Sequence, residues 1–379
     1  MTEAAPRGLD GTRTIAVVAG LAVGGCLTWN VSNVGAVADP LSDEYGVSLA
    51  AIGLLTTALF LTHLLIQLPA GRGADRFGAR AVALAAVAAT VLGCAILLAD
   101  DAFGIALAGR AVVGLGSGAG FVAGLDLVRA GGGGPLLQGV YGGATMAGGG
   151  LALMVVPALT QATDWRAPYW SALLLALVAA LPVLAVSGLS RAGHTGAGVV
   201  RDPRLLPLGV LQAASFGLAV VAGNWAVPLL EREGASAAAA GVAAGLVLFA
   251  GIVTRPAGGW LAAHGAGRRV AVLGVAGVAC GSAALALGGP LWLSAAAALV
   301  LGLGAGLPFA VVFAAAQRLR PDAPAAAMAA VNATAILAIL VGTPLAGLAF
   351  DLPGDGRIAF ATIAALSAGS LVVLRRAPL

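Results

Sequence analysis

Long runs of apolar residues alternate with short polar segments along the whole chain. A helix needs about 20 mostly apolar residues to cross a bilayer, and this pattern predicts twelve such helices. Their expected ranges are 14–37, 47–70, 79–99, 104–126, 136–160, 167–187, 205–229, 237–260, 269–288, 290–315, 326–349 and 358–374. We therefore expect an all-α integral membrane protein. The longest connection falls at the midpoint of the chain, which predicts two six-helix bundles, 1–190 and 205–379, joined by a linker at 191–204.

Composition agrees with a membrane protein and excludes a soluble domain. Hydrophobic residues make up 60% of the chain and charged residues 9%, whereas soluble domains carry roughly 25% charged residues. The three cysteines, Cys26, Cys94 and Cys280, all lie in apolar runs and match neither a disulfide framework nor a metal site. We expect them to be packing residues, and we expect no metal and no cofactor.

The charges predict an orientation. All 20 basic residues are arginines; fifteen fall in the segments on one side of the expected spans and three in those on the other side. Under the positive-inside rule this bias puts both termini in the cytoplasm and the protein in the cytoplasmic membrane. The basic pI of about 9.5 then reflects topology, so membrane lipid is an expected partner and nucleic acid is not.

Two stretches of the first half recur in the second half. Pro69-Ala70-Gly71 with Gly78 match Pro256-Ala257-Gly258 with Gly265 at an offset of 187 positions, and Gly114, Gly116 and Gly118 match Gly302, Gly304 and Gly306 at 188. Both halves start on the same side and contain six expected spans, so the repeat is parallel. In transporters built from such repeats the solute binds between the halves, near the middle of the membrane.

The segment after the second expected span carries the most specific motif. Its residues are Gly71, Asp75, Arg76, Gly78 and Arg80, with the spacing G-x-x-x-D-R-x-G-x-R. This spacing resembles the loop between helices 2 and 3 of the major facilitator superfamily, and the resemblance extends over nearly the whole chain. It implies twelve helices, a carrier that works as a monomer, and a loop that gates the cytoplasmic side.

The gating acid has two candidate partners. The carboxylate of Asp75 can face the positive N-terminal end of the helix that starts after Pro324, or it can pair with Arg129. Gly71 and Gly78 would allow a tight turn. In the second copy Ala262 stands where the acid would map. The alternative is an ordinary polar loop that only orients the chain.

Two arginines lie within expected spans, where a charge is costly and usually functional. Arg110 begins the pattern R-x-x-x-G-x-G-x-G, which resembles the superfamily's helix 4 motif, whose arginine faces the central cavity. Arg255 begins R-x-x-G-G, which resembles helix 8 of nitrate/nitrite porters, where that arginine contacts the anion. The alternatives are side chains that reach the outer and the inner membrane surface. Two inward arginines without acids favour an anionic solute.

The porter resemblance is partial. The glycine-rich stretch from Gly139 to Gly150, followed by Pro157, is similar to the porters' helix 5, but their asparagine there and their second arginine, in helix 2, have no equivalent. His63 and Gln67 lie near the latter position. His63 is the mid-span group whose ordinary pKa suits proton coupling, and packing is the alternative role.

The resemblance also implies that helices 1, 4, 7 and 10 line the pathway. The candidate solute-binding residues on them are Asn30, Asn33, Gln212 and Asn224, with Trp29, Phe216 and Trp225 as walls; Asn332 is a further candidate. No nucleophile–base pair or carboxylate pair stands within a span, so we do not expect an enzyme. The function expected is secondary transport of a small anionic solute by alternating access. Efflux of a drug or metabolite and a non-transporting membrane sensor remain alternatives.

Overall fold

The twelve membrane spans expected from the hydrophobic pattern are all present as helices. The computed structural model describes residues 11–189, 198–375 and 377–379, and in this part of the chain twelve helices are long and apolar enough to cross a membrane. No strand occurs among these residues. The protein is an all-helical, multi-pass membrane protein. The expected linker, 191–204, starts outside the described residues, and its remainder forms short 3-10 turns at Val199–Arg201 and Pro203–Leu205.

The six spans of the first half are single helices. They are α1 (Gly11–Ser32), α3 (Leu49–Phe77), α4 (Ala79–Ala99), α5 (Phe103–Ala130), α6 (Pro135–Ala162) and α7 (Ala167–Ala185), and the short helix α2 (Ala38–Tyr45) connects α1 to α3.

Two spans of the second half are interrupted. The first consists of α8 (Leu206–Gln212), a π-helical turn (Ala213–Gly217) and α9 (Leu218–Arg232); the others are α10 (Ala237–Ala263), α11 (Gly267–Leu287), α12 (Leu291–Gly306) with α13 (Phe309–Leu319), α14 (Pro324–Leu348) and α15 (Arg357–Ser370). The break between α12 and α13 falls at Pro308, because proline removes a helical hydrogen bond.

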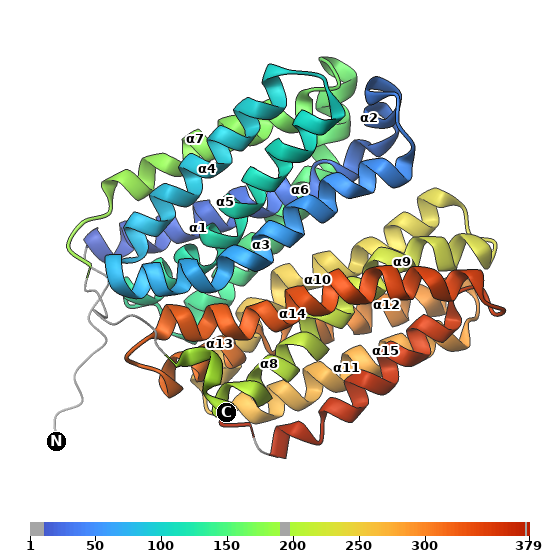
Figure 1. Ribbon diagram of the computed structural model, residues 1–379. Coiled ribbons are helices and arrows are strands. Elements are labelled where there is room, and N and C mark those ends of the chain that lie inside the picture. The colour runs from blue at the N-terminus through green and yellow to red at the C-terminus, as the bar shows by residue number, and fades with distance from the viewer. Residues whose placement is uncertain (1–10, 190–197, 376) are drawn as a thin grey trace.

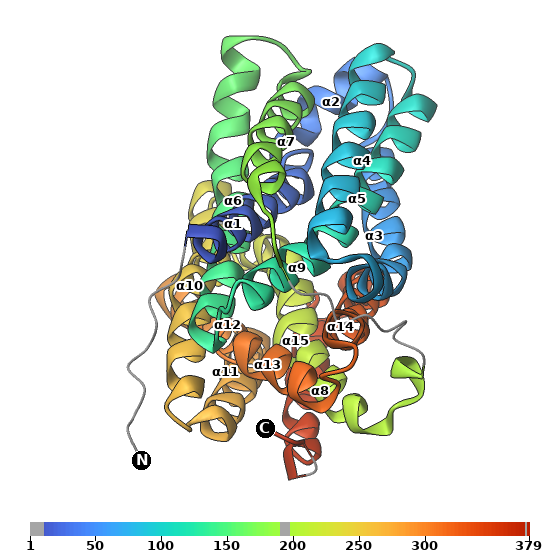
Figure 2. The ribbon, with the colours of Figure 1, turned by 90° about the vertical axis from the view of Figure 1, so that its left-hand side faces the viewer.

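The two halves lie side by side in Figure 1, with α1–α7 in the upper group and α8–α15 in the lower group. They meet along two seams. In one, α3 packs against α14; in the other, α6 packs against α10. Figure 2 shows the same two groups from the end at which α14 begins. We call this the Asp75 end and the opposite end, which carries α2, the α2 end.

The turn after the second span is shorter than the sequence suggests. Helix α3 continues to Phe77, so Asp75 and Arg76 are helical, and the chain turns only at Gly78, whose φ is +94°. Gly71 is therefore not a turn residue, contrary to the expectation from the sequence. Its missing side chain serves close packing instead: a Cβ there would lie 2.7 Å from Cα of Ala326 on α14.

Equivalent contacts recur in the two halves. Arg80 donates to the carbonyl of Leu184 at the end of α7 (3.0 Å), and Arg268, 188 positions later, donates to the carbonyl of Leu374 after α15 (2.8 Å). These donors satisfy carbonyls at helix C-termini, where a positive charge is favourable. The repeat inferred from the sequence is thus visible in three dimensions.

The structural register of the repeat between α3 and α10 is 188. Gly71 meets the start of α14, and Gly259 meets the start of α6 in the same way. The offset of 187 that matches Gly71 to Gly258 is one residue out, because the duplicated proline and glycines are shifted by one along α10. The counterpart of Asp75 is therefore Ala263.

Candidate solute site and inter-bundle contacts

A cavity of about 280 Å³ lies between the two halves. Met146 and Leu153 of α6 line it from the first half; the rest of its lining comes from the second half, on α9, α10, α12 and the π-helical turn. It extends from Arg255 toward the α2 end. Among its lining residues, Arg255 and Asn224 have polar side chains. The cavity is an apolar space with one cation and one amide.

Arg255 is held between the halves. Its Nη1 donates to the carbonyl of Gly142 (3.1 Å) and to the Thr145 hydroxyl (2.9 Å), both on α6. Its guanidinium also lies over the rings of Phe309 and Phe216, with the carbon at 4.3 and 5.0 Å from their centres. The side chain is 2% exposed, so it does not reach the membrane surface.

The charge of Arg255 is not neutralised by the protein. No carboxylate of the described residues lies within ion-pair distance of its guanidinium, and its Nε has no hydrogen-bond partner there. An uncompensated cation in a buried, apolar setting interacts strongly with an anion, because the surroundings screen it weakly. The cavity is therefore suited to a negatively charged group.

Arg110 lies elsewhere. It is fully buried inside the first half, and it donates to the carbonyls of Leu55 and Asn30 and to Oδ1 of Asn33 at 3.3, 2.9 and 3.4 Å. It is not among the residues that line the cavity. The position expected from the helix 4 motif is thus not seen in this conformation, because neighbouring helices supply acceptors for the guanidinium. A surface position is excluded as well.

Three further candidates belong to this internal network. The backbone carbonyl of Asn30 and Oδ1 of Asn33 accept hydrogen bonds from Arg110, and Asn33 Nδ2 donates to the carbonyl of Pro168 (2.7 Å). Trp29 donates from Nε1 to the Ser171 hydroxyl (3.2 Å). These contacts tie α1 to α7, and none of the three residues lines the cavity.

The candidates on the seventh span are divided between two surroundings. Asn224 and Phe216 line the cavity, as expected. Trp225 does not: its ring packs against Gly347, and its Nε1 donates to the carbonyl of Thr343 (2.9 Å), both on α14. Gln212 is buried and does not line the cavity.

His63 is enclosed within the first half. Its Nδ1 lies 2.6 Å from the Ser117 hydroxyl, and Phe60 and Phe121 flank the ring. Nε2 has no partner among the described residues. Phe121 in turn packs edge-on against Phe309, whose ring lies under Arg255. An aromatic layer thus separates His63 from the cavity.

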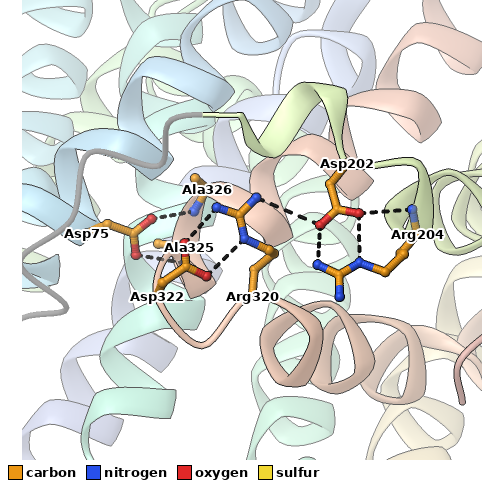
Figure 3. Close-up of polar contacts among 7 residues, drawn as sticks. All are labelled: Asp75, Asp202, Arg204, Arg320, Asp322, Ala325 and Ala326. Atoms are coloured by element: carbon orange, nitrogen blue, oxygen red, sulfur yellow. Dashed lines mark hydrogen bonds and ion pairs between the residues drawn. The ribbon is translucent and has the colours of Figure 1, made fainter.

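Asp75 joins the two halves at the opposite end from the cavity mouth. Its two carboxylate oxygens accept the backbone N–H groups of Ala325 (3.0 Å) and Ala326 (2.9 Å) at the start of α14, as Figure 3 shows. The first N–H groups of a helix have no partner within it and form a natural site for a carboxylate. Of the two partners expected from the sequence, the helix N-terminus is the one observed.

The other residues of the motif have separate contacts. Arg129 pairs with Asp126 on its own helix (2.6 Å) and not with Asp75. Arg76 is exposed and lies over the ring of Phe77. Arg80 caps α7, as described above.

An ionic network that the sequence analysis missed leads into α14. Arg320 binds Asp322 (2.6 Å) and lies 3.8 Å from Asp202, and Asp202 also binds Arg204 (2.7 Å; Figure 3). The hydrogen bonds from Arg204 hold the pKa of Asp202 below its usual value. The short spacings of Asp202–Arg204 and Arg320–Asp322 were a visible signal, but nothing in the sequence places the two pairs together.

The described residues contain no cluster of three or more histidine, cysteine, aspartate or glutamate side chains that could hold a metal ion. The cavity offers one cation, one amide and an apolar wall to a solute.

Comparisons with known proteins agree with this geometry. Residues 19–202 match the model of the Major Facilitator Superfamily. The twelve spans of the described residues share their fold with solved transporter structures over nearly the whole chain. Residues 19–202, in the first half of the chain, belong to the Major Facilitator Superfamily, whose members are transporters and not enzymes.

Solved structures share the fold over nearly the full length. The human organic anion transporter MFSD10 (TETRAN) is similar with a TM-score of 0.76 and 16% identity, over 96% of this chain and 99% of that one. The E. coli fucose:proton symporter FucP has a TM-score of 0.75 and 15% identity, over 96% and 98%. A FucP structure in the outward conformation has a TM-score of 0.74 and 15% identity, with the same coverage. No curated protein matches the chain in sequence.

Proposed function

We propose that this protein is a secondary carrier of a small anionic solute, and that Arg255 holds the anionic group. The observation that carries this proposal is the uncompensated guanidinium at one end of an apolar cavity between the halves. An anion would replace the missing counter-charge, and a cation would be repelled. Because the rest of the lining is almost entirely apolar, an organic anion fits better than a small inorganic one. Asn224 offers a second polar contact.

The transport mechanism that we propose is alternating access, with the structure as the outward-facing state. The described hydrogen bonds between the halves involve Asp75, Gln138 and Arg255, and they lie at the middle of the molecule or toward the Asp75 end. The cavity extends the other way, toward the α2 end.

The orientation in the membrane follows from the arginine bias. If the Asp75 end is cytoplasmic, both termini lie in the cytoplasm and the protein resides in the cytoplasmic membrane. The motif of Gly71, Asp75, Arg76, Gly78 and Arg80, with Arg129 nearby, would then gate the cytoplasmic side. We also propose that the carrier works as a monomer.

His63 is the proposed proton-coupling residue. A histidine buried beside Ser117, with an unpartnered Nε2, can change its charge when the pathway becomes accessible. A second candidate function, efflux of an amphipathic metabolite or drug, is favoured by the apolar lining of the cavity. The same cavity could also serve a membrane sensor, which flux measurements distinguish from a carrier.

The test begins with thermal shift of the detergent-purified protein against inorganic anions, carboxylates and lipophilic cations. A ligand that binds only the folded state raises its stability by RT ln(1 + [L]/Kd). We expect a carboxylate to raise the Tm of the wild type and to have no effect on Arg255→Gln. The stabilising compound is then used for flux into proteoliposomes.

Arg166→Gln is the matched control, because Arg166 lies on the surface at the α2 end and pairs with Asp101. It should keep both the shift and the flux. Stabilisation by lipophilic cations alone would replace the anion proposal with efflux. Binding without flux would support the sensor.

A further inference from the structure

Three buried amide side chains have polar atoms that find no hydrogen-bond partner among the described residues. Gln67, Gln212 and Asn332 are each at most 1% exposed. Neither polar atom of Gln67 or of Gln212 has a partner among the described residues, and neither has Oδ1 of Asn332. Polar groups that are buried without partners cost free energy, and folded proteins rarely tolerate several together. Their presence calls for an explanation.

Gln67 and Asn332 lie along the α3–α14 seam. A Cβ on Gly71 would be 2.9 Å from that of Ala329. Helices α3 and α14 run in opposite directions there. Gln67, four residues before Gly71, and Asn332, three residues after Ala329, are therefore both about one turn nearer the α2 end.

Helix α8 brings Gln212 to the same region. Thr334 on α14 donates to the carbonyl of Gly209 (2.7 Å), and Gly217 packs against Ala335. Gln212 lies between these two contacts. It is also four residues before Phe216, which lies under Arg255. The π-helical turn between them is a feature that recurs at functional sites.

The repeat relates this group to the anion site. Gly118 packs against Ile66, and Gly306, 188 positions later, packs against Thr254, 188 positions after Ile66. Gln67 therefore occupies, on α3, the position that Arg255 occupies on α10. The α6–α10 seam carries a cation at this level, and the α3–α14 seam carries an amide.

We propose that Gln67, Gln212 and Asn332 form an uncharged subsite that hydrogen-bonds a neutral hydroxyl or carbonyl group of the solute. Each amide offers both donors and an acceptor. The nearby charge of Arg255 disfavours a cation at this place. The inference rests on the proposed anion site, and it specifies the solute further: one anionic group for Arg255 and one neutral polar group for the amides.

The amides are enclosed in the present state, in which Asp75 holds the start of α14. Separation of α3 from α14 would expose them to a solute held at Arg255. The subsite would then act in the state that is open at the Asp75 end. There it would supply hydrogen bonds that the apolar cavity lacks.

The experiment compares matched carboxylates on the purified protein. The pairs are propionate and lactate, butyrate and 3-hydroxybutyrate, and benzoate and 4-hydroxybenzoate, and affinity is read from thermal shift at several concentrations. We expect the hydroxylated member of at least one pair to bind about tenfold tighter, which is the contribution of one good hydrogen bond. In Gln67→Leu this preference should disappear, and affinity for the plain carboxylate should stay within about twofold.

Two comparisons keep a folding defect apart from a binding defect. Gln67→Leu removes an unpartnered amide, so its Tm should equal or exceed that of the wild type. Gln138→Leu, which loses a partnered amide at the interface, should keep the preference for the hydroxylated member.

The outcomes separate the inference from the proposed function. Carboxylate binding that depends on Arg255 but shows no hydroxyl preference, or a preference that survives Gln67→Leu, would overturn the amide subsite and leave the anion site standing. Absence of any Arg255-dependent binding would overturn both. A Gln67→Leu protein that unfolds more readily would show that the amide has a structural partner.

Discussion

Asp75 and Ala326 belong to opposite halves of the chain, and the carboxylate of Asp75 accepts the backbone N–H of Ala326 at 2.9 Å. With the bond from Ala325, this contact places a negative charge on the positive end of α14. Charges at helix termini contribute up to about 2 kcal/mol in partly buried geometries. A carrier whose two states differ by a few kcal/mol would respond to the loss of this contact.

The first prediction concerns Asp75→Asn, which keeps the shape of the side chain and removes its charge. We expect the outward-facing state to lose about 1–2 kcal/mol, which shifts the equilibrium about 5- to 30-fold. Spin labels on Arg72→Cys and Pro321→Cys, in a Cys280→Ser background, should report a longer distance. Asp101→Asn, the same change at the α2 end, should leave the distance distribution as it was.

Gly71→Ala tests the close approach of α3 and α14. The new Cβ would lie 2.7 Å from Cα of Ala326 and 2.8 Å from the carbonyl oxygen of Ala325. Overpacking of this kind costs about 1–3 kcal/mol. The same spin-label pair should move apart, whereas Gly53→Ala, on the same helix with nothing within 4 Å, should have no effect. An unchanged distance in Gly71→Ala would mean that the seam relaxes around the methyl group.

The two buried arginines should behave differently when removed. Arg110 makes three hydrogen bonds inside the first half, so Arg110→Ala leaves a void and unpartnered acceptors and should lower the stability by about 3 kcal/mol. Arg255→Ala should cost less, because Arg255 faces the cavity. Thermal unfolding in detergent measures both. A larger loss for Arg255→Ala would assign the structural role to that residue instead.

The ionic network before α14 predicts a pH dependence. The folded-state pKa of Asp202 is lowered, first by the hydrogen bonds from Arg204. A depressed carboxylate pKa contributes stability that is fully present above the unfolded value of about 3.9 and is lost as the pH falls through the folded value. Asp202→Asn should therefore have a lower Tm than the wild type at pH 7. The difference should begin to shrink as the pH falls below about 4 and should be lost only below the folded-state pKa; a difference that does not shrink below pH 4 would refute this account.

The topology prediction can be checked without a ligand. A fluorescent reporter that matures only in the cytoplasm should be active when it is fused to either terminus, because the arginine bias predicts that both termini are cytoplasmic. A reporter that is active only outside the cytoplasm should work at the connection between α6 and α7. The reverse pattern would invert the orientation and with it the assignment of the Asp75 end.

The spans could be predicted from the sequence because length and hydropathy alone define them, and their positions in the structure agree to within a few residues for most helices. The contact of Asp75 with the start of α14 was one of the two expected from the sequence, because Asp75 belongs to a motif of fixed spacing. The exact end of α3 was not: polar residues suggested a loop at 71–80, but tertiary packing against α14 keeps it helical to Phe77.

Side-chain surroundings were harder to predict than the elements that carry them. Arg110 and Trp225 lie on helices that line the pathway in this family, yet each points toward a neighbouring helix of its own half. Hydropathy does not show which face of an apolar helix meets the cavity. The lack of a hydrogen-bond partner for Gln67 could not be predicted either, because it depends on which side chains the helices packed against α3 present to it.

Ala263 has a consequence for how the two halves can move. It occupies in the second half the place of Asp75, so the α6–α10 seam has no carboxylate at that level; the seam is held by close glycine packing, as at Gly259 against Pro135, and by the hydrogen bonds of Arg255 to Gly142 and Thr145. Small residues let two helix backbones pack closely. Such packing would allow α6 and α10 to rotate slightly against each other without separating. The two halves would then separate by rotation about an axis along α6 and α10, with the contact of Asp75 broken first.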